Sequence, residues 1–493
     1  MTATTMDTAL GATDPQWDTW DVRDGWETVI GLEVHTELLT ATKLFSSSPN
    51  HFGGEPNTHI DPVSLGLPGS LPVLNRQAVE LAIRAGLALG CSVQRSIFAR
   101  KNYFYPDMPK DYQISQYELP INIEGQLELP GGKVIGIERA HLEEDTGKST
   151  HATGGESSGR IHDAEYSLVD YNRAGVPLLE IVGRPDLRSP DEAKAYVSEL
   201  RSVLVAVGAS DGKMEEGSLR VDCNVSVRRR GDDTLGTRCE IKNVNSLRSL
   251  GRAIEYEASR QVDLLEAGER VRQETRHWNE DEGRTLTLRS KEEATDYRYF
   301  PEPDLVELDP DPEWVEEIRA GLPMLPRERR AALTAELGAT ATTAALVVER
   351  GLDELVLAAA GSGGDAGRLL THAEHNLSDE RAVSLDPTHF AELTTLEVGG
   401  SLTATQAKQV LVQMVGSGRS PSEIAAERGF ESMDSTELES ILDGLIAAHP
   451  DDWAKYTAGE DKVAGFFVGQ VMKATGGKAD GKAVTALLRQ RRG

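Results

Sequence analysis

Polar and apolar residues alternate along Trp26-Glu-Thr-Val-Ile-Gly-Leu-Glu-Val-His-Thr-Glu-Leu38, and this period of two predicts a β-strand. Glu33, His35 and Glu37 share one face of that strand, because side chains two positions apart point the same way. Two carboxylates and an imidazole in a row can bind a divalent cation. The solvent-facing side of any half-buried strand shows the same pattern, so the cation site needs support from other strands.

Two further segments carry acidic residues at unusual places. Glu180 lies inside the apolar run Pro177-Leu-Leu-Glu-Ile-Val182, which predicts a buried strand. An unpaired buried carboxylate costs on the order of several kcal/mol, so a metal ion or a lysine is expected beside it. Three consecutive acids occur in His141-Leu-Glu-Glu-Asp-Thr-Gly-Lys-Ser149. They repel one another unless cations bind or solvent screens them, and a solvated acidic turn remains the alternative.

A hairpin with a polar face is predicted near the middle of the chain. Alternation is complete in Arg220-Val-Asp-Cys-Asn-Val-Ser-Val227, which turns Arg220, Asp222 and Asn224 to one side. A glycine-containing turn and the returning run Thr237–Val244 complete the hairpin. Carboxylates beside cationic side chains on one sheet favour phosphoryl transfer, because Mg²⁺ takes oxygen ligands that it shares with substrate phosphates.

Longer strings resemble one protein family. They are Gly31-Leu-Glu-Val-His-Thr-Glu-Leu38, Arg100-Lys-Asn-Tyr-Phe-Tyr-Pro-Asp-Met-Pro-Lys-Asp-Tyr-Gln-Ile-Ser-Gln116, His141-Leu-Glu-Glu-Asp145, Lys213-Met-Glu-Glu-Gly-Ser-Leu-Arg220 and Asp296-Tyr-Arg-Tyr-Phe-Pro-Glu-Pro-Asp304. The chain resembles the GatB family, one of the subunit types of the bacterial tRNA-dependent amidotransferases, from about Trp26 to the C-terminus. Ordered, aromatic-rich strings of this length carry far more information than a single short motif.

The resemblance implies a kinase half-reaction that uses ATP and Mg²⁺. The side-chain carboxylate of glutamate misacylated on a glutamine tRNA, or of aspartate on an asparagine tRNA, becomes an acyl phosphate. Ammonia then displaces phosphate and forms the amide. This order is chemically sensible, because a carboxylate reacts poorly with ammonia until one of its oxygens becomes a good leaving group.

The resemblance also implies roles for individual residues. The expected cation-binding set is Glu33, His35, Glu144 and Glu180, with Glu143 as a near neighbour. The expected nucleotide and phosphate side of the pocket consists of Arg220, Asp222 and Asn224, with Lys110 as a further phosphate contact. The residues expected where ammonia enters are Lys101 and Tyr103, which join Glu144 and Glu180 in the expected catalytic set.

The chain shows no means of making ammonia. The nearest match to the glycine-serine string of amidases is Thr153-Gly-Gly-Glu-Ser-Ser-Gly159, which is polar and predicts a flexible loop. Cys223 faces the apolar side of its predicted strand, and Cys91 follows an apolar helical run, so neither suggests a glutamine-hydrolysing thiol. A partner must supply ammonia. In the family these partners are an amidase subunit, GatA, and a small subunit, GatC.

Composition favours a large cytoplasmic enzyme. A length of 493 residues predicts about three domains. The first 24 residues lack a signal-peptide pattern, no run reaches the roughly 18 apolar residues that span a bilayer, and the three cysteines form no C-x-x-C pair. The net charge of −28 opposes tRNA binding in general, but residues 462–493 contain seven Lys or Arg and one acid. This basic end is the expected tRNA contact, with a solvated helix terminus as the alternative.

The predicted fold class is α+β in three regions. Residues 1–24 are expected to be a disordered leader, and residues 25–300 form a strand-rich catalytic body with helices near Asn75–Leu89 and Pro190–Val207. Alanine- and leucine-rich segments, such as Ala341–Ala360 at helical spacing, then predict a helical domain over 301–401 and further helices over 402–493. The resemblance implies a cradle-shaped catalytic domain with a glutamine-synthetase-like fold, a helical middle domain and a YqeY-like, tRNA-binding tail.

Two alternatives from other function classes stay open. Thr403–Val415 and Ser420–Arg428 have the spacing of a helix-turn-helix, which would make the chain a DNA-binding regulator. The second of these helices carries Glu423 and Glu427 against Arg428, so it would meet DNA phosphate with net negative charge. A carboxylate–amine ligase that uses free glutamate is closer in chemistry. The sequence does not distinguish glutamate-tRNA from aspartate-tRNA as substrate.

Overall fold

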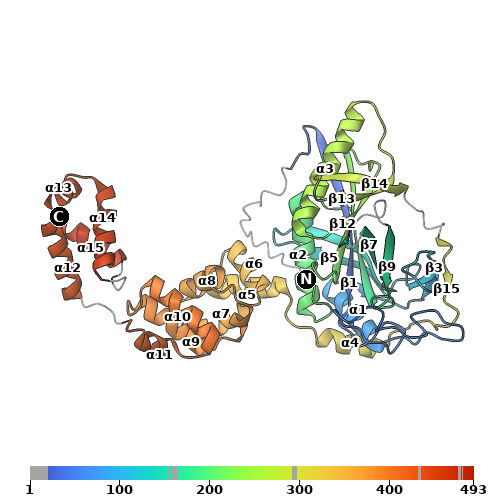
Figure 1. Ribbon diagram of the computed structural model, residues 1–493, viewed down its shortest axis with the longest axis horizontal. Coiled ribbons are helices and arrows are strands. Elements are labelled where there is room, and N and C mark those ends of the chain that lie inside the picture. The colour runs from blue at the N-terminus through green and yellow to red at the C-terminus, as the bar shows by residue number, and fades with distance from the viewer. Residues whose placement is uncertain are drawn as a thin grey trace, which may run out of the picture. The chain divides into compact units, whose positions relative to one another are not determined.

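The computed structural model describes residues 20–153, 156–157, 165–290, 297–430, 435–475, 479 and 481–492. The chain divides into two compact units, Met1–Pro326 and Arg327–Gly493 (Figure 1). The predicted leader therefore lies mostly outside the described residues. Each unit has its own core, and the units are described separately below.

The first unit is built on one large sheet. Its strands are β1 (Trp26–Glu37), β2 (Ser92–Val93), β3 (Ala99–Asn102), β4 (Tyr112–Ser115), β5 (Asn122–Glu128), β6 (Val134–Glu144), β10 (Pro177–Gly183), β11 (Leu219–Arg229), β12 (Cys239–Val244), β13 (Glu274–Asn279), β14 (Arg284–Ser290) and β15 (Phe300–Pro301). Across the described residues the order is β14-β13-β12-β11-β1-β10-β6-β4-β3-β15, with β5 pairing with β6 and β2 with β5. A smaller sheet contains β7 (Lys148–Thr153), β8 (Glu156–Ser157) and β9 (Tyr166–Asp170).

Helices cover the apolar face of the large sheet. These are α1 (Arg76–Ala88), α2 (Pro190–Ala206) and α3 (Leu247–Glu266), and α4 (Pro312–Ala320) packs on α1. Apolar residues of the sheet, such as Leu32, Ile181 and Val225, share one buried core with these helices. Helices α2 and α3 pack side by side in this layer (Figure 1). Because alternate side chains of a strand point to opposite faces, the polar residues of the same strands lie on the face away from the helices.

Local sequence explains where the helices begin. Asn75 caps α1 by accepting hydrogen bonds from the backbone amides of Gln77 and Ala78. Ser189 caps α2 in the same way, and Pro190 occupies the first turn, where no amide hydrogen is needed. The predicted helices near Asn75–Leu89 and Pro190–Val207 are therefore confirmed.

The second unit is helical throughout its described residues. It contains α5 (Pro326–Leu337, beginning at the unit boundary), α6 (Ala341–Glu349), α7 (Asp353–Gly361), α8 (Ala366–His375), η3 (Glu380–Ser384), α9 (Pro387–Val398), α10 (Ala404–Ser417), α11 (Pro421–Glu427), α12 (Ser435–Ala448), α13 (Pro450–Thr457), η4 (Asp461–Val463), α14 (Ala464–Ala474) and α15 (Gly481–Arg492). The helical segment predicted over residues 341–360 is in fact two helices. Gly351 adopts a φ of +67° between them, a conformation that ends a helix.

The described residues of this unit form two separate cores. The first extends from Leu333 to Ala425 and contains residues on both sides of position 402, including Leu393 and Val410. The second contains Leu442, Phe467 and other apolar residues of α12 to α15. The predicted domain boundary at 402 therefore does not coincide with a boundary between cores. Among the described helices, none is long and apolar enough to cross a membrane.

Helices α10 and α11 correspond to the possible helix-turn-helix. Gly418 ends α10 in the left-handed conformation, and Ser420 caps α11. Ile424 and Ala425 of α11 are buried in the first core of the unit. The sequence of α11 contains no Lys or Arg, and the preceding Arg419 pairs with Glu427. Helix α11 thus packs into the core, and its acids Glu423 and Glu427 oppose contact with DNA phosphate.

Candidate active site

The polar face of the large sheet carries a row of ionisable side chains. Strand pairing places His35 of β1 between Arg220 of β11 and Glu180 of β10, and Glu180 in turn lies opposite His141 of β6. Directly opposite residues share a face, so these side chains leave the sheet on the same side. The predicted hairpin of β11 and β12 is confirmed and continues the row outward.

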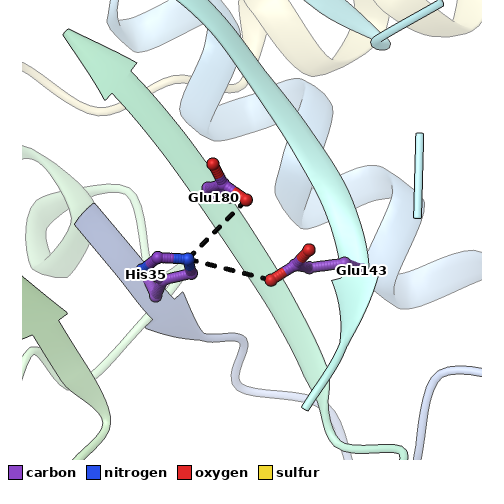
Figure 2. Close-up of side chains that lie close together, drawn as sticks. All are labelled: His35, Glu143 and Glu180. Carbon is purple, nitrogen blue, oxygen red and sulfur yellow. Dashed lines mark ion pairs between the residues drawn. The ribbon is translucent and has the colours of Figure 1, made fainter. Parts of the chain in front are cut away.

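His35, Glu143 and Glu180 form the centre of this row. His35 Nε2 lies 3.6 Å from Glu180 Oε2 and 3.9 Å from Glu143 Oε1. Figure 2 shows the three side chains converging from β1, β6 and β10. One potential ligand atom from each residue lies within 4.8 Å of the other two. This spacing suits a cation that bridges two carboxylates and an imidazole.

Electrostatics at the cluster favour a positive ion. Burial and the charge of Glu180 raise the pKa of Glu143 to about 7. Burial alone would lower the pKa of His35, but the hydrogen bond and charge of Glu180 outweigh it and raise the pKa to about 9. Burial opposes ionisation of Glu180, yet His141 and His35 hold its pKa well below the usual range. A divalent cation would relieve the repulsion between the two carboxylates, and the donor set of oxygens and one imidazole fits Mg²⁺ with water ligands.

Glu144 lies apart from this cluster. Glu143 pairs with Leu178 and Glu144 with Pro177, so the two glutamates leave β6 on opposite sides. Both carboxylate oxygens of Glu144 accept hydrogen bonds from Lys110, at 2.7 and 2.5 Å. The backbone amide of Ile114 donates a further one. Glu144, expected in the cation set, therefore lies outside the cluster of His35, Glu143 and Glu180, and Lys110, expected as a phosphate contact, pairs with Glu144.

Glu33 is a neighbour of the cluster, in register with Asp222 of β11. The side-chain amide of Asn224 donates to Glu33 at 2.9 Å. Burial and the charge of Glu180 raise the pKa of Glu33. Desolvation opposes ionisation of half-buried Asp222, but its ion pair with Lys242 keeps the pKa of this carboxylate below its usual value. The structure brings Glu33, Asp222 and Asn224 together beside the cluster.

A cavity of about 510 Å³ opens beside Arg220. Arg220 donates to buried Asp145 at 2.6 Å, and Arg173 lies 3.4 Å from the same carboxylate. Burial would raise the pKa of Asp145, but these two guanidinium groups hold it low. The lining also includes Lys148 and the exposed ring of Phe52. The lining also contains the acids Glu37, Asp170, Glu215 and Glu216. The guanidinium groups can contact phosphate, and the exposed ring can stack on a base.

Aromatic rings border the other side of the cluster. Lys101 Nζ lies 4.8 Å from the centre of the Tyr297 ring. The charge of Lys101 lies close enough to Glu143 and Glu180 to lower the pKa of both. Tyr299 is half-buried near the same carboxylates, and burial together with their charges raises its pKa. Tyr103 stacks on Tyr105 with ring centres 4.6 Å apart.

Residues that sequence reasoning left unassigned include His141, Asp145, Arg173, Tyr297 and Tyr299. The strand period was a usable signal for His141, because residues 141 and 143 of one strand share a face. The tyrosines belong to one of the strings that carry the family resemblance, but no pattern in the chain links them to a strand some 200 residues earlier.

The basic C-terminal helix is partly neutralised. Arg491 pairs with Glu439 and Asp443 of α12, and Arg492 pairs with Asp461. Arg489 is exposed at the surface of α15. The local excess of cations in this segment is therefore smaller than the sequence count suggests.

Comparison with known proteins identifies the family. A model of the GatB/GatE catalytic domain matches residues 28–316, and a model of the GatB domain matches residues 357–491. Proteins named as the B-type subunits of aspartyl/glutamyl-tRNA(Asn/Gln) amidotransferases are similar along almost their whole length. The protein from Kineococcus radiotolerans is 48% identical over 95% of this chain and 97% of its own. Those from Moorella thermoacetica and Salinispora arenicola are both 49% identical, over 94% and 98% of this chain and 99% of their own.

Proposed function

The chain belongs to the GatB/GatE family of tRNA-dependent amidotransferase subunits, and we propose that it activates the side-chain carboxylate of misacylated tRNA in that reaction. The observation that carries the proposal is the cluster of His35, Glu143 and Glu180 beside a cavity whose lining includes Lys148, Arg173 and Arg220 as well as four acidic residues. This arrangement serves phosphoryl transfer from ATP to a carboxylate. The names of the relatives include both Asp-tRNA(Asn) and Glu-tRNA(Gln), and either is a substrate candidate here.

In the proposed reaction the terminal phosphoryl group of ATP passes to the side-chain carboxylate of the esterified glutamate or aspartate. The products of this step are ADP and an acyl phosphate. Ammonia attacks the acyl carbon and phosphate leaves, which produces the amide on the tRNA. Mg²⁺ held by His35, Glu143 and Glu180 would neutralise phosphate oxygens.

Several side chains have roles that follow from their positions. Arg220 faces the cavity and can take up charge on the phosphates, while Asp145 holds its guanidinium in place. Asn224 orients Glu33 beside the cluster. Lys101 faces the carboxylates from the aromatic side, where it can hold the substrate carboxylate or stabilise charge as ammonia attacks. Tyr103 directly follows β3, the strand that contains Lys101, and we assign it to the proposed ammonia entrance.

The proposal includes partners. The relatives are subunits, as their names state, and the present chain carries no amidase nucleophile that sequence or described structure supports. We assign ammonia production to an amidase partner of the GatA type, with a small GatC-type partner that completes the complex. We assign tRNA contact to the helices of α12 to α15, for which the exposed Arg489 is one candidate. A tRNA substrate also implies a cytoplasmic reaction.

The test is ATP-dependent amidation by the full chain with co-expressed partner subunits. Glu-tRNA(Gln), Asp-tRNA(Asn) and free glutamate are compared with ammonium chloride as the nitrogen donor. Amidation of tRNA-bound substrate, lost in a Glu143→Gln variant, is the expected result. Equal reaction of free glutamate would point instead to a small-molecule carboxylate–amine ligase. Absence of ADP formation with every substrate would refute the proposal.

A further inference from the structure

His141 is a buried histidine without an ordinary hydrogen bond. It lies on β6, opposite Glu180 in strand register, and none of its surface is exposed. Both ring nitrogens lack a hydrogen-bond partner among the described residues. A histidine that served packing alone would normally place at least one nitrogen against a carbonyl or hydroxyl group.

The Nε2 atom of His141 faces the two carboxylates of the proposed cation site. It lies 3.5 Å from Glu180 Oε2 and 4.0 Å from Glu143 Oε2. The same Oε2 atom of Glu180 lies 3.6 Å from His35 Nε2. Glu180 therefore stands between two imidazoles, with His35 on one side and His141 on the other.

Burying the ring of His141 without hydrogen bonds costs free energy. A buried polar group without a partner costs about 1–3 kcal/mol. A movement of a few tenths of an ångström that brings Nε2 within hydrogen-bond distance of Glu180 removes the cost at Nε2, while Nδ1 keeps no hydrogen-bond partner among the described residues. Carboxylates that bind a cation are themselves usually held by hydrogen bonds from neighbouring groups, which fix their orientation.

We propose that His141 is a positioning residue of the cation site, whose Nε2–H donates to Glu180 and holds that carboxylate towards His35 and Glu143. The inference rests on the proposed function, because it takes these three residues as the cation ligands. His141 itself touches neither substrate nor reacting atoms in this scheme. Its effect on the reaction passes through the affinity of the site for the ion.

The test compares two substitutions in the full chain with its partner subunits, using Mn²⁺ as the probe. His141→Leu fills the space without a donor, and His141→Gln places an amide nitrogen near the position of Nε2. Mn²⁺ affinity is measured from the electron paramagnetic resonance signal of the free ion. Thermal unfolding in EDTA measures the stability of the metal-free protein. His151→Leu, on β7, is the matched control because His151 contacts Ser167 at the surface.

We expect His141→Leu to weaken Mn²⁺ binding 10- to 100-fold. Its unfolding temperature in EDTA should equal or exceed that of the parent, because an unsatisfied buried group has been removed. His141→Gln should recover most of the affinity, and His151→Leu should match the parent. Mn²⁺ affinity of His141→Leu within twofold of the parent would overturn the inference, as would equal losses in the leucine and glutamine variants.

Glu180→Gln separates failure of this inference from failure of the proposed function. Suppose that the parent and His141→Leu bind Mn²⁺ with the same affinity, whereas Glu180→Gln does not bind it. The cation site is then supported, and the role of His141 is refuted. If the parent and Glu180→Gln bind Mn²⁺ equally, the cation site itself is refuted, and the role of His141 with it.

Discussion

Replacing Glu143 and Glu144 by glutamine, one at a time, should produce opposite effects on stability and cation binding. The two residues are adjacent in sequence, and glutamine keeps the size of the side chain while removing its charge. Glu143 faces His35 and Glu180, whereas Glu144 leaves the strand on the other side and binds Lys110. Comparing Glu143→Gln with Glu144→Gln therefore tests whether the two faces of β6 belong to different sites.

The larger loss of stability is expected for Glu144→Gln. The side chains of Lys110 and Glu144 are 5% and 3% exposed, and the ammonium contacts both carboxylate oxygens. Removing one partner of a buried ion pair costs about 3–5 kcal/mol, because the other charge stays buried without compensation. Lys110 also lies 5.0 Å from the Tyr112 ring centre, a contact too weak to replace the carboxylate.

Glu143→Gln should leave the metal-free protein at least as stable as the parent. Burial and the charge of Glu180 already disfavour the ionised form of Glu143, as its raised pKa of about 7 shows. An uncharged glutamine removes that repulsion, which is worth about 1 kcal/mol for each unit of pKa relieved. The same substitution removes a cation ligand, so Mn²⁺ affinity should fall by at least 100-fold.

Both variants are assayed for thermal unfolding in EDTA and for Mn²⁺ binding by electron paramagnetic resonance. Glu144→Gln should melt earlier and, in its folded state below that transition, bind Mn²⁺ within about threefold of the parent. Glu143→Gln should show the reverse. If Glu144→Gln lost Mn²⁺ as completely as Glu143→Gln while still folded, the assignment of the two glutamates to separate sites would be wrong.

Three further predictions concern other parts of the molecule. Burial lowers the pKa of Lys43 to about 8 from its usual 10.5, so between these pH values the unfolded chain binds more protons than the folded chain. The free energy of unfolding should therefore rise with pH across that window, by on the order of 3 kcal/mol. Lys43→Met should flatten this rise in denaturant titrations. Arg220→Lys should raise the KM for ATP about 10-fold, because lysine lacks the planar guanidinium that can donate to Asp145 and to phosphate at the same time. Mn²⁺ affinity should be unchanged in a parallel titration. Arg489→Ala should weaken tRNA binding and reduce the slope of log affinity against log salt by about 1, whereas Arg491→Ala, whose guanidinium already pairs with acids of α12, should change the slope less.

Local patterns predicted the strands and helices of the first unit well. The period of two in residues 26–38 and 220–227 reflects burial of one face of a sheet, so it is written in each strand separately. The break at Gly351 escaped prediction because alanine- and leucine-rich residues flank it, and a single glycine is tolerated within many helices. The shared core across position 402 depends on contacts between helices that no single segment reveals.

The candidate site was harder to predict than the strands that carry it. Sequence reasoning placed Glu33, His35, Glu144 and Glu180 together, with Glu143 as a near neighbour, on the strength of a family resemblance. Which acid faces His35 depends on the phase of β6 relative to β10, and that phase comes from pairing between strands. The relation of His141 to Glu180 has the same origin.

The run Glu143-Glu144-Asp145 illustrates how the fold resolves a charge pattern that would otherwise repel itself. Each acid has its own cationic partner: Glu143 lies by His35, Glu144 binds Lys110, and Asp145 binds Arg220. Alternation sends the first two to opposite faces of β6, and the third follows the end of the strand towards the cavity. Glu143, a ligand of the proposed cation site, and Asp145, which holds Arg220, therefore lie two residues apart at the end of β6. A shift of β6 by one residue would misplace both of these acids.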